Sequence, residues 1–197
     1  SAFHLGKWLD RIGFFAALTS LDYTKVRDYC DDDEKYAMMR DERNWTPLHI
    51  ACNDGQLDMI DLLLEYPVDL DFRDTSGSTP LHYLFSRKLD DSKKAIELLE
   101  KISKKCPQTK WNAANNNGST YLHLTVQSNA NDLSVWLLNH KANADVVDES
   151  GLSPLLLAVT CDQIDVVTVM LEKGADIFQK TKQGKSALEL AEEKGHK

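Results

Sequence analysis

A four-residue word recurs at a nearly fixed interval, and it constrains the fold of this chain more than any other feature. The word is Thr-Pro-Leu-His at residues 46–49 and again at 79–82, and related forms begin at residues 120, 153 and 186. Three of the four intervals are 33 residues long and the other is 41. A word that returns at a fixed interval is typical of a stack of repeated units, each burying its apolar face against its neighbours.

Residues that favour tight turns precede each word, and a pair of short apolar helices follows each of the first four words. Each turn ends in Asn or Gly, which tolerate the positive φ that a tight turn needs (Asn44, Gly77, Gly118, Gly151 and Gly184). After the first word, residues 48–52 form one apolar run, Asp54-Gly55 interrupts it, and residues 59–64 form a second. We expect the Thr46 hydroxyl to cap the first helix and Pro47 to lie in its first turn.

The same order of turn, helix and helix resembles the ankyrin-repeat family, and residues 171–177, Leu-Glu-Lys-Gly-Ala-Asp-Ile, match its helix end and loop. The resemblance implies an all-α ankyrin-repeat solenoid of stacked antiparallel helix pairs with β-turn fingers. We predict a single domain over 1–197, with a degenerate capping repeat at 1–40, repeats at 41–73, 74–114, 115–147 and 148–180, and a partial repeat at 181–197. The last repeat has one helix only, which favours a cut or a continuation into a larger protein.

The longer interval contains eight extra residues. We expect them to enlarge the turn at residues 87–91 and to extend the second helix through Lys105, where Cys106-Pro107 ends it. Residues 88–110 contain seven Lys and four acidic residues, so this insertion is locally basic in an acidic chain.

Composition excludes several classes of protein. The formal charge of -8 opposes general binding to a phosphate backbone, and no apolar run approaches the ~20 residues that cross a bilayer. The four cysteines are widely spaced and complete no zinc motif, so we interpret them as packing residues of a protein in a reducing compartment, the cytoplasm or the nucleus.

No group of residues indicates catalysis, a metal site or a cofactor. His49, His82 and His123 recur at one position of successive repeats, whereas a catalytic site needs unlike groups that converge. We expect these imidazoles to form hydrogen bonds with the backbone of the turns. Leu156 occupies the same position in the next repeat, and we expect it to pack against apolar side chains instead. The phosphate-binding loop, dinucleotide, metalloprotease and nucleophile-elbow motifs are absent, so we predict no enzymatic activity and no cofactor.

The resemblance implies a concave groove formed by the fingers and the ends of the first helices, which binds a partner protein or another domain of the same chain. The predicted contact residues are Arg43, Trp45, Asn53, Asp54, Ser78, Ser86, Arg87, Gln127 and Leu152. Trp45 has two open interpretations: it packs over the first repeat, or it anchors the partner.

Two other functions stay open. In the first, the chain is a regulatory or targeting segment of a larger signalling protein, such as a small-GTPase regulator, a kinase or a channel. In the second, its basic insertion at 88–110 contacts anionic lipid. We expect no nucleic-acid partner and no membrane span, and a monomer unless an open end of the stack pairs.

Overall fold

The structure is a computed structural model that describes residues 2–195, with side chains from residue 6 onward. These residues divide into two compact units. Unit 1 runs to residue 75 and includes 79–84, and unit 2 consists of 76–78 and the chain from 85 onward.

Unit 1 is built from helices that pack in pairs. Helices α1 and α2 contact one another, as do α3 and α4, and α1 also packs on α3 and α2 on α4. The elements are α1 (Ala2–Thr19), α2 (Tyr23–Asp32), the 3-10 helix η1 (Glu34–Met38), α3 (Pro47–Asp54), α4 (Leu57–Leu63) and α5 (Pro80–Phe85), which reaches the boundary with unit 2.

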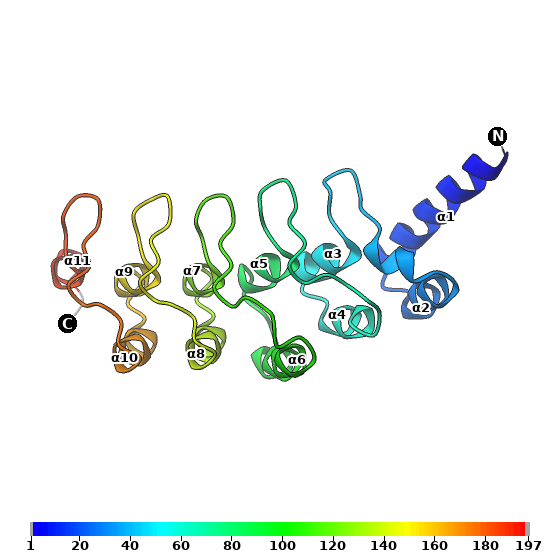
Figure 1. The fold of residues 1–197 in the computed structure, drawn as a ribbon. Coiled ribbons are helices and arrows are strands. Elements are labelled where there is room, and N and C mark those ends of the chain that lie inside the picture. Colours follow the sequence, from blue (N-terminus) through cyan, green and yellow to red (C-terminus); the bar gives the residue numbers. More distant parts are fainter. Residues whose placement is uncertain (1, 196–197) are drawn as a thin grey trace. The chain divides into compact units, whose positions relative to one another are not determined.

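Unit 2 has two layers of helices. Figure 1 shows α7, α9 and α11 in one layer and α6, α8 and α10 in the other, with the turns projecting beyond the first layer on the side away from the second. Contacts join α7 to α8, α9 to α10, and each helix to the next within its layer. The helices are α6 (Ser92–Lys105), α7 (Tyr121–Gln127), α8 (Asn131–Asn139), α9 (Pro154–Thr160), α10 (Ile164–Glu172) and α11 (Ala187–Lys194).

The first residue of the repeated word caps the first helix at α3, α9 and α11. In α3 the Thr46 hydroxyl accepts from the backbone N–H of His49, and Pro47 lies in the first turn, as predicted. Ser153 caps α9 in the same way, and Ser186 forms a capping box with Glu189 at α11. The described residues contain only two isolated β-bridges besides helices and turns, so the all-α prediction is confirmed.

Each unit buries its own aromatic and aliphatic core. Phe14 is fully buried in unit 1, where its ring lies 5.8 Å from that of Tyr29, and Tyr121 is fully buried in unit 2, 5.1 Å from Phe85. All four cysteines are free thiols. Burial raises the pKa of the Cys30 thiol to about 11, as expected of a packing residue. The same prediction is wrong for Cys161, which is exposed just after the end of α9.

The insertion lengthens one outer helix. Helix α6 has 14 residues, against seven in α4 and nine in α8, and it ends at Lys105 as the sequence predicts. One aromatic side chain of unit 2 contacts the start of this extension. Trp136 donates from Nε1 to Glu100 Oε1 at 2.7 Å and packs edge-on against Trp111 at 4.9 Å.

Candidate protein-interaction surface

The turn before each first helix is a finger that its own hydrogen bonds hold in shape. In the first finger, residues 41–45, Asp41 Oδ1 accepts from the backbone N–H groups of Arg43 and Trp45, both at 2.9 Å. Asn44 adopts a φ of 63°, as the turn chemistry predicts. In the third finger, position 118 requires glycine for two reasons, its positive φ and the lack of space for a Cβ. Its φ is 72°, and an added Cβ would lie 3.1 Å from the Cα of Asp148.

Two later fingers in unit 2 repeat this bonding with different residues. Asn115 Oδ1 accepts from the backbone N–H of Ser119 at 3.1 Å. Asp148 Oδ1 accepts from the N–H of Leu152 at 3.1 Å and from the Ser150 hydroxyl at 2.6 Å. The finger base therefore needs a side-chain oxygen, which an amide supplies as well as a carboxylate does.

The two carboxylates titrate at lower pH than ordinary aspartates. Burial alone would raise the pKa of Asp41, but the N–H of Trp45 and the guanidinium of Arg43 lower it below its usual 3.8. Burial would likewise raise the pKa of Asp148, and the Ser150 hydroxyl and the Leu152 N–H lower it. Both groups are therefore ionised at neutral pH and stabilise the folded fingers in that form.

We expect Asp148→Asn to remove acid sensitivity from the fourth finger. Because the folded-state pKa of Asp148 is lowered, its stabilisation is present above pH 3.8 and is lost as the pH falls through the folded pKa. The variant should unfold at the same urea concentration as the wild type at neutral pH, as Asn115 performs this role in the preceding finger. Between pH ~5 and ~2 it should lose less stability than the wild type. Equal losses over that range would contradict this role for Asp148.

The predicted residues of the first finger come together around one indole ring. The Arg43 guanidinium lies 3.9 Å from the centroid of the Trp45 ring and forms an ion pair with Asp41 at 2.8 Å. Trp45 Nε1 donates to Asp74 Oδ2 at 2.8 Å, and the ring packs 4.5 Å from that of Tyr83. Trp45 is therefore half-buried, but it packs on residues of the following repeat and not over the first repeat as one interpretation expected, and its remaining surface is open.

The other two residues predicted in unit 1 lie at the opposite end of α3. Asn53 Nδ2 donates to Asp54 Oδ1 at 2.9 Å, and Gly55 caps the helix with a φ of 69°. Helix α3 has eight residues, so at 1.5 Å per residue about 12 Å of helix separates this pair from the finger. The structure thus places two separate polar groups along α3.

Unit 2 brings three of its predicted residues to neighbouring helix ends. The Ser128 hydroxyl donates to the carbonyl of Phe85 at 3.2 Å, so Phe85, the first residue of this part of unit 2, lies beside the end of α7. Ser86, Arg87 and Gln127 are exposed there. Leu152 is half-buried in the fourth finger, whereas Ser78 is buried and its hydroxyl accepts from that of Ser76 at 2.9 Å. Ser78 therefore lies inside its finger, where it bonds to a neighbouring hydroxyl, and not on the exposed surface predicted for it.

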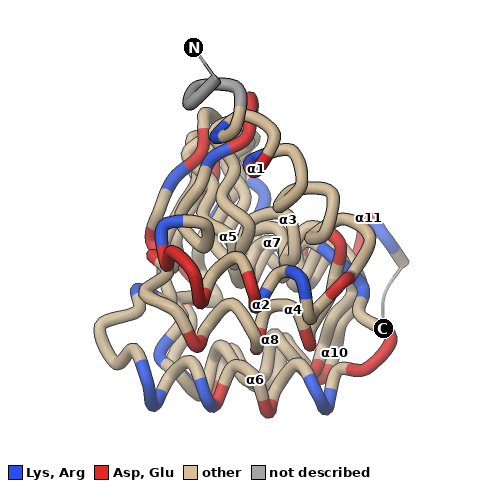
Figure 2. The backbone as a smooth tube through the Cα atoms, turned by 90° about the vertical axis from the view of Figure 1, so that its right-hand side faces the viewer, with Lys and Arg blue, Asp and Glu red and all other residues tan. Residues whose placement is uncertain are grey.

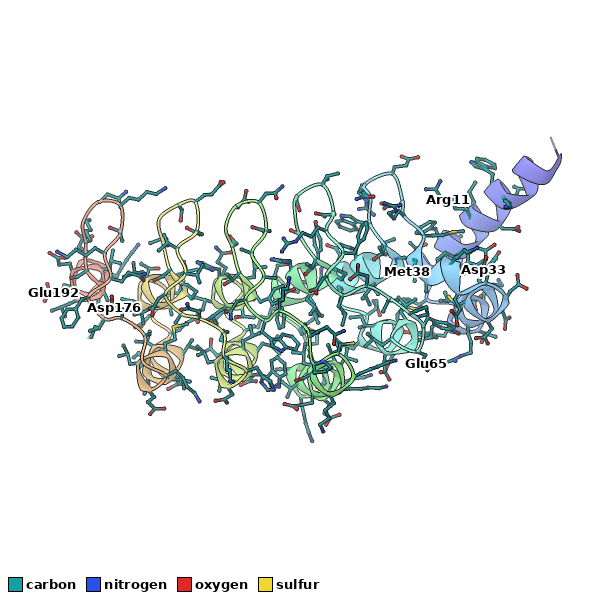
Figure 3. All side chains as sticks on the ribbon, in the orientation of Figure 1. Arg11, Asp33, Met38, Glu65, Asp176 and Glu192 are labelled. Carbon is teal, nitrogen blue, oxygen red and sulfur yellow. The ribbon has the colours of Figure 1, made fainter. Side chains whose placement is uncertain are left out.

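A cleft in unit 1 was not predicted from the sequence. It has a volume of about 620 Å³, and the first finger forms one wall through Asp41, Glu42 and Arg43. Helix α1 forms the other wall, mainly through Trp8, Arg11, Ile12 and Phe15. Figure 3 labels Arg11 on this helix, and its Nη2 donates to the carbonyl of Arg40 at 2.6 Å. The sequence does contain a signal for the helix that forms this wall, because the apolar residues at 5, 8, 9 and 12 have helical spacing.

The basic insertion does not present a surface of one sign. Figure 2 shows blue and red segments following one another along α6. Glu97 and Glu100 lie between Lys93 and Lys94 on one side and Lys101, Lys104 and Lys105 on the other. Because lipid headgroups are attracted by clustered positive charge, this pattern gives little support to anionic-lipid contact.

The recurrent histidines bond to the Thr of their own words, and His123 also bonds turn backbone of the next repeat, as predicted. Nδ1 of each ring lies 2.8 or 2.9 Å from the hydroxyl of the Thr three residues earlier. In unit 2, Nε2 of His123 also lies 3.1 Å from the carbonyl of Leu152 in the next finger. Burial, opposed by this hydrogen bond and by Asp148, lowers the pKa of His123 below its usual 6.5. Leu156 is fully buried at the same position of the next repeat.

Nothing in the described part of the chain has the arrangement of a metal site. Within it, no three His, Cys, Asp or Glu side chains lie close enough together to hold an ion. Across residues 2–195, the helices are either too short or too polar to cross a membrane.

Helix pairs that stack in register and project hydrogen-bonded fingers define a helical-repeat protein. Family models described as ankyrin repeats match residues 38–84, 91–181 and 122–197. The chain belongs to the ankyrin-repeat family.

Several curated proteins are similar to this chain over about three quarters of its length. Rabankyrin-5 from Mus musculus is 31% identical over 151 residues, which cover 75% of this chain and 12% of that protein. Palmitoyltransferase AKR1 from Lachancea kluyveri is 32% identical over 156 residues, 76% of this chain and 20% of the enzyme. The B-cell lymphoma 3 protein homolog from Mus musculus is 30% identical over 151 residues, 76% and 33% of the two chains. The chain thus spans a third or less of these relatives.

Proposed function

We propose that this chain is a protein-protein interaction module without catalytic activity of its own. Its partner contacts the finger tips and the exposed ends of the first helices, in each of the two units. The observation that carries the proposal is that the finger backbones are fixed by internal hydrogen bonds while polar side chains beside them stay exposed. A surface that is already ordered loses little conformational entropy on binding.

The chemistry of the two contact regions supports this function. The first region is the stacked pair Arg43 and Trp45 with the cleft beside it, and Arg and Trp are the residue types enriched at binding hot spots. The second region consists of Ser86, Arg87 and Gln127 in unit 2. It offers hydrogen-bond donors and acceptors, and Arg87 adds a positive charge. The four free thiols favour action in the cytoplasm or the nucleus.

Arg87→Ala tests the second region. The partner is first captured from a lysate of the source organism with the wild-type chain and identified by mass spectrometry, and its affinity is then measured by calorimetry. Removing a hot-spot Arg should weaken binding about tenfold, or ~1.4 kcal/mol. The matched control is Lys93→Ala, which removes an exposed positive charge from the insertion. Unchanged affinity for Arg87→Ala with weakened affinity for Lys93→Ala would move the contact to α6.

A second proposal concerns the context of the module. We infer that it serves as the regulatory or targeting segment of a larger signalling protein. Its support is that each relative described above is at least three times as long as the segment it shares with this chain. Sequencing the full-length transcript tests this directly: a reading frame that encodes these repeats together with a signalling domain supports it, and one that encodes only these repeats contradicts it.

A further inference from the structure

A pocket in unit 2 belongs to neither of the contact regions described above. It has a volume of about 240 Å³ and lies between the starts of α6 and α8, which Figure 1 shows as neighbours in one layer of that unit. Lys88, Leu89 and Ser92 form one wall, and residues 129–133 form the other. At ~30 Å³ per water, the pocket has room for about eight waters or for one amino-acid residue.

The insertion builds the first wall by enlarging one turn. Six residues, 86–91, come directly before α6, whereas three come before α8, at 128–130, and three before α10, at 161–163. The longer turn places Lys88 and Leu89 at the pocket. The two shorter turns have no residues equivalent to these. The pocket is therefore a feature of the insertion and not of the repeat as such.

A small residue leaves the pocket unfilled from the second wall. In the following repeat, the residue before α10 is Gln163, which is 4% exposed and donates from Nε2 to the carbonyl of Val126 at 2.7 Å. The equivalent residue before α8 is Ala130, whose methyl group cannot make such a bond. The Ser128 hydroxyl bonds the equivalent carbonyl instead, that of Phe85, at 3.2 Å. The space that a glutamine side chain would fill is therefore open.

One residue of the second wall has a buried polar atom that lacks a hydrogen bond. Asn131 lines the pocket, and its Oδ1 is buried but meets no donor among the residues that the structure describes. A buried acceptor without a donor is unfavourable, and such atoms are rare in native proteins. A ligand that supplies an N–H or O–H group at this place would satisfy the acceptor.

The other polar groups of the pocket favour a negative charge. Because Ala130 offers no side-chain cap, no cap bonds the first three backbone N–H groups of α8, at residues 131–133, and these lie at the positive end of the helix dipole. Lys88 adds an ammonium group and Ser92 a hydroxyl. The carboxylate of Asp132 also lines the pocket, but it is exposed to water, which screens its charge.

The C-terminal residue of a peptide chain matches both requirements. It carries a carboxylate, and its own backbone N–H lies on the same Cα as a donor. We propose that this pocket binds the free C-terminus of a partner protein, with the carboxylate at Lys88 and the N–H groups of α8 and the last N–H donating to Asn131 Oδ1. The inference rests on the proposed function, since it names what the partner presents beside the second contact region.

The test uses the full chain and three short probes, with NMR shifts of the backbone N–H groups of α8 as the measure of binding. The first probe is N-acetyl-alanyl-alanine with a free carboxylate. The second is its C-terminal amide, which lacks the negative charge. The third is N-acetyl-alanyl-lactate, which keeps the carboxylate and replaces the last N–H by an ester oxygen. We expect the first to bind with a Kd on the order of 1 mM and each of the others about tenfold more weakly.

Four variants assign the contacts. Lys88→Gln should weaken the first probe about tenfold, whereas Lys93→Gln, the matched control, removes an exposed charge just outside the pocket wall and should leave its affinity unchanged. Asn131→Ala should bind the first and third probes equally, because it lacks the acceptor that tells them apart. Ala130→Gln should fill the pocket and abolish binding, and Gln163 shows that this position of the repeat accommodates a glutamine. Circular dichroism and urea denaturation confirm that each variant is folded.

Four outcomes would overturn the proposal. The first is that the acid probe does not bind, and the second is that the acid and the amide bind equally. The third is that free alanine binds more tightly than the acid probe, which would make the pocket a site for an amino acid. The fourth is unchanged binding to Ala130→Gln, which would place the probe elsewhere. None of these results bears on the finger surface, because the affinity of Arg87→Ala for the intact partner tests that surface separately.

Discussion

Replacing His123 by alanine should lower the free energy of unfolding by about 3 kcal/mol. The imidazole is fully buried in unit 2. Because its Nε2 donates to the carbonyl of Leu152, Nδ1 is the acceptor, and it takes the N–H of Thr120 at 3.1 Å. Alanine leaves a cavity and deprives both groups of a buried partner. Urea denaturation followed by circular dichroism measures the loss.

His123→Leu separates the hydrogen bonds from the volume. Leucine fills most of the space, as Leu156 does in the next repeat, so the loss should fall to about 1–2 kcal/mol, the cost of the unmade hydrogen bonds. The wild type should also lose stability as the pH falls below 6.5, because the folded-state pKa of His123 is lowered and the unfolded chain takes up the proton first. The leucine variant should lack that component. Equal stability of the alanine variant and the wild type would refute this role for His123.

Replacing Trp45 by alanine should destabilise unit 1 by about 2–3 kcal/mol. The variant loses the packing of the indole against Tyr83 and removes the Nε1 donor from Asp74, a buried carboxylate that also accepts from the Tyr83 hydroxyl at 2.5 Å. Leaving a buried carboxylate with fewer donors is costly. The urea midpoint of the variant measures this loss.

Trp45→Phe is the variant that tells packing from partner recognition. It keeps a ring beside Tyr83 and removes only the N–H, so the loss of stability should be about 1 kcal/mol, the value of one hydrogen bond. If Trp45 also anchors the partner, affinity should fall about tenfold in the stable phenylalanine variant. Unchanged affinity would leave Trp45 with a packing role alone.

The local architecture was predictable because its causes are short-range. A capping hydroxyl, a proline in the first turn and a Gly or Asn with positive φ act within a few residues, so the words at 46, 120, 153 and 186 marked the helix starts correctly. The end of α6 at Lys105 followed from Cys106-Pro107 for the same reason. The first half of α1 was not predicted, because no capping word precedes it.

The surface depended on contacts distant in sequence. Ser78 was predicted at the partner surface and is buried, whereas Cys161 was predicted as a packing residue and is exposed. The sequence left two interpretations of Trp45 open and pointed to neither Asp74 nor Tyr83, which the fold brings to the ring. Leu155 and Leu188 occupy the same position of the same word, yet the first is buried and the second is exposed.

The sequence by itself determined that this chain forms a series of capped helix pairs, since each turn and each helix start is encoded by the residues within it. The tertiary structure alone decided which apolar side chains remain open for recognition. Burial depends on the neighbour that packs against a residue, and identical repeats have different neighbours at the middle and at the ends of a stack.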